Sequence, residues 1–420
     1  MRKSLVFGLC FLLVCSMIIP VSVGYNVRNA VERQPSYSEN GNTLYVGGDG
    51  PGNYSRIQDA INDANNGDTV FVYDDSSPYY ELLVINKSID LIGEDRDTTV
   101  IDGNYKGTVV DIQADSVMVS GFTIIECKKQ NNFQYNVIDI IRCENVIIKD
   151  NIISLGPEPE HNPFIAGVYI KSSSNNLIQD NIIFDDSDAP RTTGIHIEDN
   201  SKNNNISDNS IYGYLTGICF KSSNNNIIFG NSIFETYWGV DLWFADGNKI
   251  LYNNIHNNKY KGIDIDGGSN HLISGNIIVN NGNGGEFDGG IIFSDDSSNN
   301  IITYNYISDN NIQGILLLGS DDNQITDNHI SSNNILGIYA DFAYRNTISR
   351  NNIIFHKYNA YFDSCYFFRY RNNWDGNYWG DYDGEGYYII RGRVGFLIFF
   401  SFPWLNLDRN PASEPYDYDF

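Results

Sequence analysis

The sequence has little positive charge, few histidines and methionines, and no long apolar run after its first residues. Its 420 residues include 27 Lys and Arg against 52 Asp and Glu, which gives a formal net charge of −25. Nucleic-acid binding needs a basic face, so this balance argues against a nucleic-acid partner. The later apolar stretch Val394–Phe402 has about half the length that a bilayer span requires, so we expect no membrane span in the mature chain.

Cysteine is also scarce, and helical periodicity is missing over most of the chain. Beyond the first residues the cysteines are Cys127, Cys143, Cys219 and Cys365. Their spacing matches no metal-binding pattern, and their three possible disulfide pairings stay open. Copper sites favour His, Cys and Met, and with 6 His and 3 Met copper is a disfavoured cofactor.

Between about residues 108 and 362 the chain shows no helical period, which excludes a coiled coil.

The first 24 residues carry the pattern of a secretory signal peptide. Arg2 and Lys3 precede the apolar segment SLVFGLCFLLVCSMII, and the small residues Ser22–Gly24 follow it before Tyr25. The apolar segment is short for a bilayer span, which favours a cleaved signal over a membrane anchor. We therefore expect a secreted or cell-envelope protein in which residues 25–42 form a linker.

Two short patterns recur along the chain, and most of their steps are 22 or 23 residues long. A glycine followed by alternating apolar residues occurs at Gly167, Gly194, Gly217, Gly239, Gly262, Gly290, Gly314 and Gly337. The triplet Asn-x-Ile begins at Asn151, Asn181, Asn209, Asn231, Asn253, Asn276, Asn305, Asn328 and Asn351. Short β-branched strands separated by Asn, Ser and Gly turns at this period are typical of the coils of a parallel β-helix.

The period also predicts how the coils pack and where the helix ends. Coils should stack about 4.8 Å apart around one apolar column, because a single coil cannot bury its own apolar face. We expect each recurring Asn at a bend, bonded to the neighbouring coil and in a left-handed conformation. A helix over Asn53–Asn65 should cover the first coils. The predicted parts are residues 43–104, the N-terminal cap and first coils; 105–362, the repeats; and 363–420, an aromatic cap.

Three stretches resemble a known family. Tyr45–Gly103, from YVGGDGPGNYSRIQDAINDAN to DLIGEDRDTTVIDG, resembles the opening segment of pectin-lyase-fold proteins. The coils resemble the NosD-like, carbohydrate-binding and sugar-hydrolase β-helix repeat, and NNWDGNYWGDYDGEGYY resembles the cap of NosD-like surface proteins. The resemblance implies an all-β, right-handed, single-stranded parallel β-helix with an N-terminal capping helix and an aromatic C-terminal cap. The catalytic signatures of polygalacturonases, pectin methylesterases, pectate lyases and alginate epimerases are absent from the sequence, so the fold leaves the function open.

The register predicts an acidic patch on the outside of the glycine-led strands. After each glycine the first and third residues should point inward, and the second and fourth should face solvent. Asp241, Asp264 and Asp266 then lie together beside Trp243. Close carboxylates raise the pKa of at least one of them, and an acid beside a base is what glycosidic-bond cleavage requires, with Trp243 as a stacking face for sugar. The same three carboxylates would alternatively bind calcium, or form by chance in so acidic a protein.

Further outward residues extend this patch. His196 and Glu198 are weaker catalytic candidates, and Tyr169, Lys171 and Lys221 are candidates for substrate binding. The signs of Lys171, Glu198 and Lys221 alternate, which also fits a structural charge ladder between strands.

The lengthened turns bear on the same face. Those at Ser154–Ala166, Phe184–Thr193 and Val279–Gly289 fall on one rim, where they would wall a groove over the aspartates.

Four functions are compatible with these features. The leading one is binding of polysaccharide or glycoconjugate at the cell surface. The others are a polysaccharide lyase or hydrolase using the aspartates, a NosD-like accessory protein for a copper centre, and a structural surface-layer protein. The sequence selects neither the sugar nor the oligomeric state.

Overall fold

The computed structural model describes residues 41–127, 135–156, 165–186, 192–364, 371–395, 401–418 and 420. The predicted signal peptide and Cys365 lie outside these ranges. Within them the one helix is α2 (Ile57–Asp63), which buries Ile57, Ala60 and Ile61, three of the apolar positions that the sequence places on one face. The helix is shorter than predicted at its start, where the Glu81 carboxylate accepts hydrogen bonds from the amides of Ile57 and Gln58 at 2.9 and 3.1 Å. No helix in the described part is long and apolar enough to cross a membrane.

The strands form three sheets, called A, B and C here. Sheet A consists of β1 (Thr43–Val46), β2 (Thr69–Val72), β4 (Asp90–Gly93), β7 (Met118–Ser120), β10 (Ile147–Lys149), β13 (Leu177–Gln179), β16 (Asn205–Ser207), β19 (Ile227–Phe229), β22 (Lys249–Leu251), β25 (Leu272–Ser274), β28 (Ile301–Thr303), β31 (Gln324–Thr326), β34 (Thr347–Ser349) and β37 (Asn373–Asp375). Sheet B consists of β5 (Val100–Asp102), β8 (Thr123–Ile125), β11 (Ile152–Ser154), β14 (Ile182–Phe184), β17 (Ser210–Tyr212), β20 (Ser232–Phe234), β23 (Asn254–His256), β26 (Ile277–Val279), β29 (Tyr306–Ser308), β32 (His329–Ser331), β35 (Asn352–Ile354) and β38 (Tyr378–Trp379). Sheet C consists of β3 (Leu83–Ile85), β6 (Val110–Ile112), β9 (Ile138–Ile141), β12 (Ala166–Lys171), β15 (Thr193–Glu198), β18 (Thr216–Lys221), β21 (Trp238–Trp243), β24 (Lys261–Asp266), β27 (Gly289–Ser294), β30 (Gln313–Leu318), β33 (Leu336–Asp341), β36 (Tyr358–Ser364), β39 (Tyr388–Gly395) and β40 (Ser401–Asp408).

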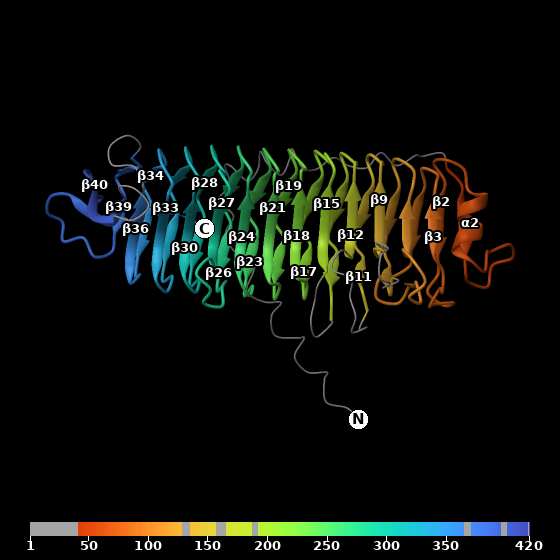
Figure 1. Ribbon diagram of the computed structural model, residues 1–420. Coiled ribbons are helices and arrows are strands. Elements are labelled where there is room, and N and C mark those ends of the chain that lie inside the picture. Colours follow the sequence, from red (N-terminus) through yellow and green to blue (C-terminus); the bar gives the residue numbers. More distant parts are fainter. Residues whose placement is uncertain are drawn as a thin grey trace, which may run out of the picture. The chain divides into compact units, whose positions relative to one another are not determined.

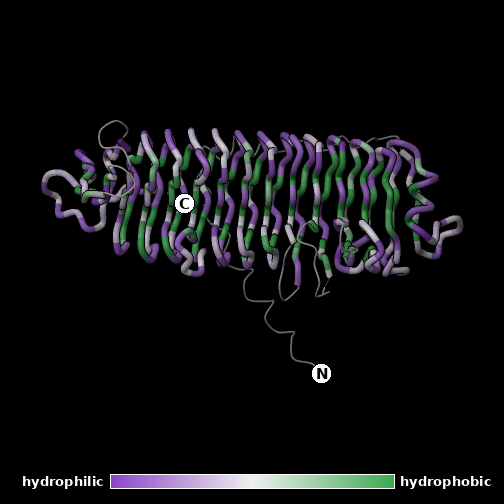
Figure 2. The backbone as a smooth tube through the Cα atoms, in the orientation of Figure 1, coloured by the Kyte–Doolittle hydropathy of each residue, from purple (hydrophilic) through white to green (hydrophobic). Residues whose placement is uncertain are grey.

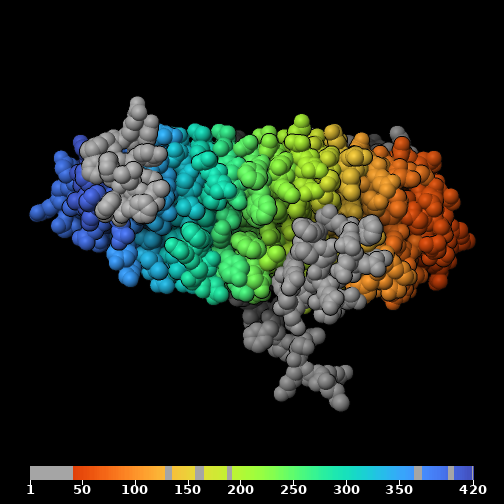
Figure 3. Space-filling view, in the orientation of Figure 1, coloured from red at the N-terminus to blue at the C-terminus, as the bar shows by residue number. Residues whose placement is uncertain are grey.

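Each full coil adds one strand to each sheet, and every strand pairs in parallel with its counterparts in the coils before and after it. The exception is the antiparallel pair β39–β40 at the end of sheet C. Figure 1 shows the coils following one another from α2 to β40, and Figure 3 shows them as adjoining bands at the surface. The sheets do not end at residue 362, because β37, β38 and β39 continue all three of them. Trp374 and Trp379 there pair with inward isoleucines and are buried.

The predicted apolar column forms the core. In the coil that ends with β24, Ile250, Ile255, Ile263 and Ile265 are all fully buried, and Figure 2 shows apolar residues recurring coil after coil. The recurring glycine lets sheet C approach sheet B. A Cβ on Gly262 would lie 2.8 Å from the Cγ2 atom of an isoleucine in β26 and 2.7 Å from a backbone oxygen of β27. A side chain at this position would therefore clash with the core.

The recurring asparagines form a hydrogen-bonded ladder at the corner between sheets A and B. The Asn253 amide nitrogen donates to the carbonyls of Ile228 and Leu251 at 2.9 and 3.0 Å and to the side-chain oxygen of Asn276 at 3.0 Å. The same ladder contains Asn151, Asn181, Asn209, Asn231, Asn276, Asn305, Asn328 and Asn351. The prediction that each Asn is itself left-handed is wrong. The residue before it takes that conformation, as Tyr252 does with φ of 55°, and the Asn side chain is thereby aimed into the corner.

Candidate functional site

The structure brings the predicted outward residues of sheet C into adjacent coils. In the middle column, Asp241 pairs in register with Cys219 on one side and Asp264 on the other. In the outer column, Trp243 pairs with Lys221 and Asp266. The earlier coils continue the two columns through Tyr169, His196, Lys171 and Glu198.

The prediction that both columns face solvent is wrong for the middle one. Asp241 and Asp264 are only 6% and 8% exposed, and Tyr169 and Cys219 are also buried. Trp243 in the outer column is 44% exposed. A middle-column aspartate is short and stands between longer outward side chains, such as Lys261 beside Asp264 and Trp243 beside Asp241, so it is shielded without entering the apolar core. Cys143 and Cys219 are buried free thiols.

The three aspartates are incompletely hydrogen-bonded. One oxygen, Oδ1, of each of Asp241, Asp264 and Asp266 is buried without a hydrogen-bond partner. The other oxygen of Asp264 is 2.6 Å from the Lys261 ammonium. Buried polar atoms almost always find partners, and leaving one unpaired costs about 1–3 kcal/mol, so three of them in one place require an explanation.

The surroundings of Asp241 and Asp264 favour different protonation states for these two neighbouring carboxyls. Burial, and then the charge of Asp264, raises the pKa of Asp241 to about 8. Burial also raises the pKa of Asp264, but the Lys261 ammonium offsets part of that effect. Asp241 therefore holds a proton at neutral pH, while Lys261 stabilises the ionised form of Asp264. An acid and a carboxylate consequently stand side by side, about one inter-strand spacing of ~4.8 Å apart.

The sequence also offers the same aspartates as an alternative calcium site. Among the residues that the structure describes, no group of three or more His, Cys, Asp or Glu side chains is placed to hold a metal ion. Asp264 and Asp266 are two residues apart on one strand, a separation of about 6.6 Å. Lys261 already provides the positive charge beside Asp264.

Residues of β12 and β15, with Asp199 directly after β15, form a separate network. Glu198 accepts a hydrogen bond from the Tyr169 hydroxyl and one from Lys171 at 2.9 Å. The His196 Nε2 atom lies 3.5 Å from Glu198, and Lys171 also contacts Asp199 at 3.0 Å. Interaction with His196, followed by those with Tyr169 and Lys171, lowers the pKa of Glu198. Three neighbours thus engage the Glu198 carboxylate, which fits the structural charge ladder better than a catalytic role, although the buried His196 Nε2 atom has no hydrogen-bond partner.

A hollow next to Asp266 adds residues that the sequence reasoning missed. It has a volume of about 480 Å³, and Asp295, Asp296, Leu318, Gly319 and Phe342 line it. Burial, and then Asp295, raises the pKa of Asp266, which links the hollow to the acidic patch. All the lining residues lie at or just after the ends of sheet C strands. These lining residues could have been identified from the sequence by their position at or directly after the end of each glycine-led strand.

Two exposed aromatic rings flank this hollow. Phe244 and Phe342 follow directly after β21 and β33 and are 62% and 45% exposed. Phe244 covers Gly267, where a Cβ would lie 2.6 Å from its ring. Together with Trp243, these rings and the acidic residues between them form one surface, which we call the acidic–aromatic surface.

The lengthened turns contribute differently from what the sequence suggested. Residues 157–164 and 187–191, in the first two turns, lie outside the described ranges. In the third turn, the Asp288 carboxylate accepts hydrogen bonds from the amides of Asn283 and Gly285 at 3.0 and 2.9 Å. Burial, then Asp363, then Glu286 of this turn raises the pKa of Asp341 to about 6. The third turn therefore acts on later coils than those of Asp241 and Asp264.

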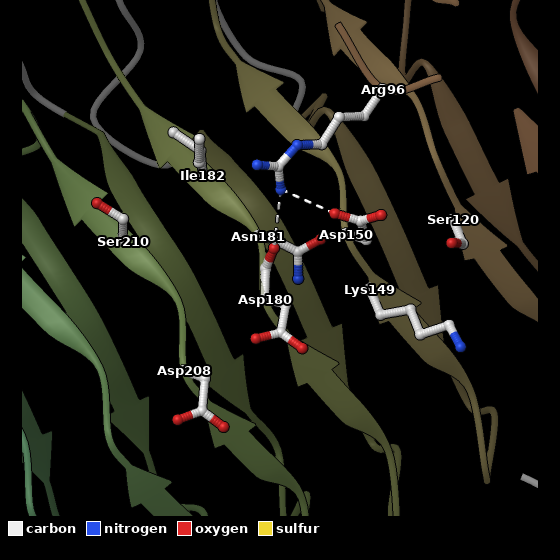
Figure 4. A pocket seen from close by; sticks show the side chains of 9 residues that line it. All are labelled: Arg96, Ser120, Lys149, Asp150, Asp180, Asn181, Ile182, Asp208 and Ser210. Carbon is white, nitrogen blue, oxygen red and sulfur yellow. Dashed lines mark hydrogen bonds and ion pairs between the residues drawn. The ribbon is translucent and has the colours of Figure 1, made fainter. Parts of the chain in front are cut away.

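A second polar groove, of about 710 Å³, follows the corner between sheets A and B. Its lining residues are Arg96, Ser120, Lys149, Asp150, Asp180, Asn181, Ile182, Asp208 and Ser210 (Figure 4). Arg96 lies 2.8 Å from Asp150 and donates to the Asp180 carbonyl at 3.4 Å. Asp150 and Asp180 occupy left-handed corner positions, which Asp tolerates well. None of the buried unpartnered polar atoms in the described residues belongs to this groove, so we favour the acidic–aromatic surface as the functional site.

Comparison with known proteins identifies the family. The model of the right-handed β-helix region matches residues 60–250, 161–287 and 239–373, which together span most of the chain. The chain belongs to the right-handed β-helix family. No curated protein sequence matches it significantly.

Solved structures share the fold at low identity. One is the DFA-IIIase from Arthrobacter chlorophenolicus A6 in complex with GF2, with 13% identity, a TM-score of 0.54, and coverage of 73% of this chain and 93% of that one. Another is a mannuronic acid-specific polysaccharide family 6 lyase from human gut microbiota, with 12% identity, a TM-score of 0.50, and coverage of 76% and 84%. At this identity the likeness establishes the right-handed parallel β-helix fold and nothing about the site.

Proposed function

We propose that this protein is secreted and binds glycans along the acidic–aromatic surface of sheet C. The observation that carries the proposal is the set of buried, unpartnered oxygens of Asp241, Asp264 and Asp266 beside the exposed ring of Trp243. Sugars present hydroxyl donors next to apolar ring faces. They would pack against the indole and present hydroxyl donors beside the aspartates at the same time.

The length of the surface favours a chain of sugars over a single one. Phe244 follows β21 and Phe342 follows β33, four coils further on. At the inter-strand spacing of about 4.8 Å, the two positions are about 19 Å apart. The predicted signal peptide would export the protein to where extracellular polysaccharides occur. The fold relative named as a mannuronic acid-specific polysaccharide lyase is in keeping with this function.

Cleavage of the bound glycan is the second candidate, and one observation favours it. Asp241 is protonated at neutral pH next to Asp264, whose ionised form Lys261 stabilises. Asp241 would donate a proton to the leaving oxygen, and Asp264 would act as base or nucleophile.

The test measures binding and cleavage with the same variants. The purified protein is applied to an array of neutral, acidic and amino-sugar polysaccharides, and each mixture is examined by mass spectrometry for new chain ends. We expect Trp243→Ala to lose binding, and we expect Asp111→Asn, in the same outward column several coils earlier, to retain it. New chain ends from the wild type but not from Asp241→Asn/Asp264→Asn would establish cleavage. Retention of no glycan by the wild type would contradict the proposal and favour a structural surface-layer role.

A further inference from the structure

Acidic side chains outnumber basic ones on the acidic–aromatic surface. Its ionisable side chains are Asp241, Asp264, Asp266, Asp295 and Asp296, with Lys261 and Lys221 as the cations. Lys261 is already bound to Asp264 at 2.6 Å. Lys221 is exposed at the edge of the surface, in register with Trp243. A ligand therefore meets an excess of carboxyl groups, on a protein whose formal net charge is −25.

We propose that this surface selects glycans with free amino groups, so that its ligand is a cationic amino-sugar polymer. The inference rests on the proposed glycan binding and narrows it to one substrate class. Acidic polysaccharides such as polyuronates would be repelled by the local carboxylates and by the net charge of the protein. Neutral sugars would supply hydrogen bonds but would leave the excess negative charge without a counter-charge.

An ammonium group suits the surroundings of these carboxyls better than a hydroxyl group does. It carries three N–H donors and a positive charge, whereas a hydroxyl has one donor and no charge. Asp241 and Asp264 are register neighbours, and each has a buried Oδ1 atom without a partner. Hydrogen bonds between charged groups are roughly twice as strong as those between neutral ones. An ammonium at this place would therefore gain more than a neutral sugar at the same position.

Binding of a cation should also release a proton. Burial and the neighbouring Asp264 raise the pKa of Asp241 to about 8. The other groups that face it are Cys219, Asp266 and Lys261, with Lys221 one coil away. A bound ammonium stabilises the ionised form of Asp241, so the carboxyl gives up its proton when the ligand binds. A neutral sugar would leave the proton in place.

Two oligosaccharides of equal length separate these possibilities. Isothermal titration with hexamers of glucosamine and of N-acetylglucosamine is carried out at about pH 6, where Asp241 is protonated. The ligands share one backbone and differ in whether the nitrogen carries a charge. We expect the glucosamine hexamer to bind at least about tenfold more tightly. We also expect its enthalpy to change with the ionisation enthalpy of the buffer, which reports proton release.

The variants tie the preference to the site. Asp241→Asn should abolish the proton release, and Asp266→Asn should weaken binding of the glucosamine hexamer about tenfold more than that of the N-acetylated hexamer. Asp111→Asn, the matched control, should change neither.

The outcomes distinguish this inference from the broader proposal. Equal or tighter binding of the N-acetylated hexamer, lost in Trp243→Ala, would overturn the preference for amino sugars and leave glycan binding intact. Retention of a polyuronate on the array with no binding of the glucosamine hexamer would also overturn it. If calcium chloride titrated the site while no oligosaccharide bound, the carboxylates would serve a metal ion, and both proposals would fail.

Discussion

Replacing Asp241 by Asn should stabilise the folded protein at neutral pH and should have no effect in acid. The folded state raises the pKa of this carboxyl from its ordinary value of about 3.9 to about 8. The folded protein therefore binds a proton more tightly than the unfolded chain does. Stability attributable to this group is highest below about pH 4 and falls as the pH rises toward 8.

The magnitude follows from the size of the shift. Between about pH 4 and pH 7 the loss spans about three pH units at about 1.4 kcal/mol each, on the order of 4 kcal/mol as an upper limit. Asn has nearly the same shape and no charge to bury, so the variant should not lose this stability.

Urea unfolding followed by circular dichroism measures the difference. The midpoints of wild type and Asp241→Asn should coincide near pH 4 and separate progressively toward pH 8, with the variant more stable. Asp111→Asn, the control substitution in the same column, should not reproduce this separation toward pH 8. An Asp241→Asn variant that is less stable than wild type at neutral pH, or that keeps the wild-type pH dependence, would refute the reasoning about this carboxyl.

Three further predictions concern the scaffold. His271 occupies an asparagine position in a second ladder, and burial lowers its pKa to about 4, so the folded protein favours its neutral form. Stability should therefore fall by about 3 kcal/mol as the pH drops from 6.5 to 4, and His271→Asn should lessen that fall in acid unfolding curves. Asn253→Ala should lower the free energy of unfolding in urea by about 3 kcal/mol, because it leaves several buried backbone groups unpaired. Its control, Asn254→Ala on the exposed side of the next strand, should change that free energy by less than about 0.5 kcal/mol. Gly262→Ala should cost about 1–3 kcal/mol in the same assay, because its Cβ would press on Ile278.

The repetitive part of the fold could be predicted from sequence because one physical requirement recurs in every coil. The spacing of Ile250, Ile255, Ile263 and Ile265 records which side chains must enter the core, and this alternation also sets the register of neighbouring strands. The pairing of Asp241 with Asp264 follows from that register alone. The family match and the sheet order agree with this prediction.

The environment of the outward residues could not be predicted in the same way. Alternation says that Asp241 points away from the core, but its burial depends on the size of side chains in the columns beside it. Lys261 contacts Asp264 because the residue before the glycine also reaches the outer face, which the simple alternation rule does not include. The sequence pattern also predicted the left-handed backbone conformation for the wrong residue of each corner. Asn253 suits that conformation, yet Tyr252 adopts it so that the amide of Asn253 can bond across three coils.

The unpartnered aspartate oxygens destabilise the folded protein. Their presence therefore indicates a role other than stabilising the fold. An apolar or amide side chain at these outward positions would meet the needs of the scaffold, as Ile292 and Leu316 do in the next coils of the same column. Active and binding sites are the places where proteins commonly retain groups that destabilise the fold. The network around Glu198 shows that the same face also holds a carboxylate with hydrogen-bond donors beside it, from Tyr169 and Lys171.

The most direct test of the account compares glycan binding by three proteins on one array: the wild type, Trp243→Ala/Phe342→Ala, and Arg96→Ala in the groove between sheets A and B. We expect the wild type and Arg96→Ala to retain the same glycans, with amino-sugar polymers strongest, and the double variant to retain none. Loss of binding in Arg96→Ala with retention in the double variant would place the site in the other groove and contradict the account.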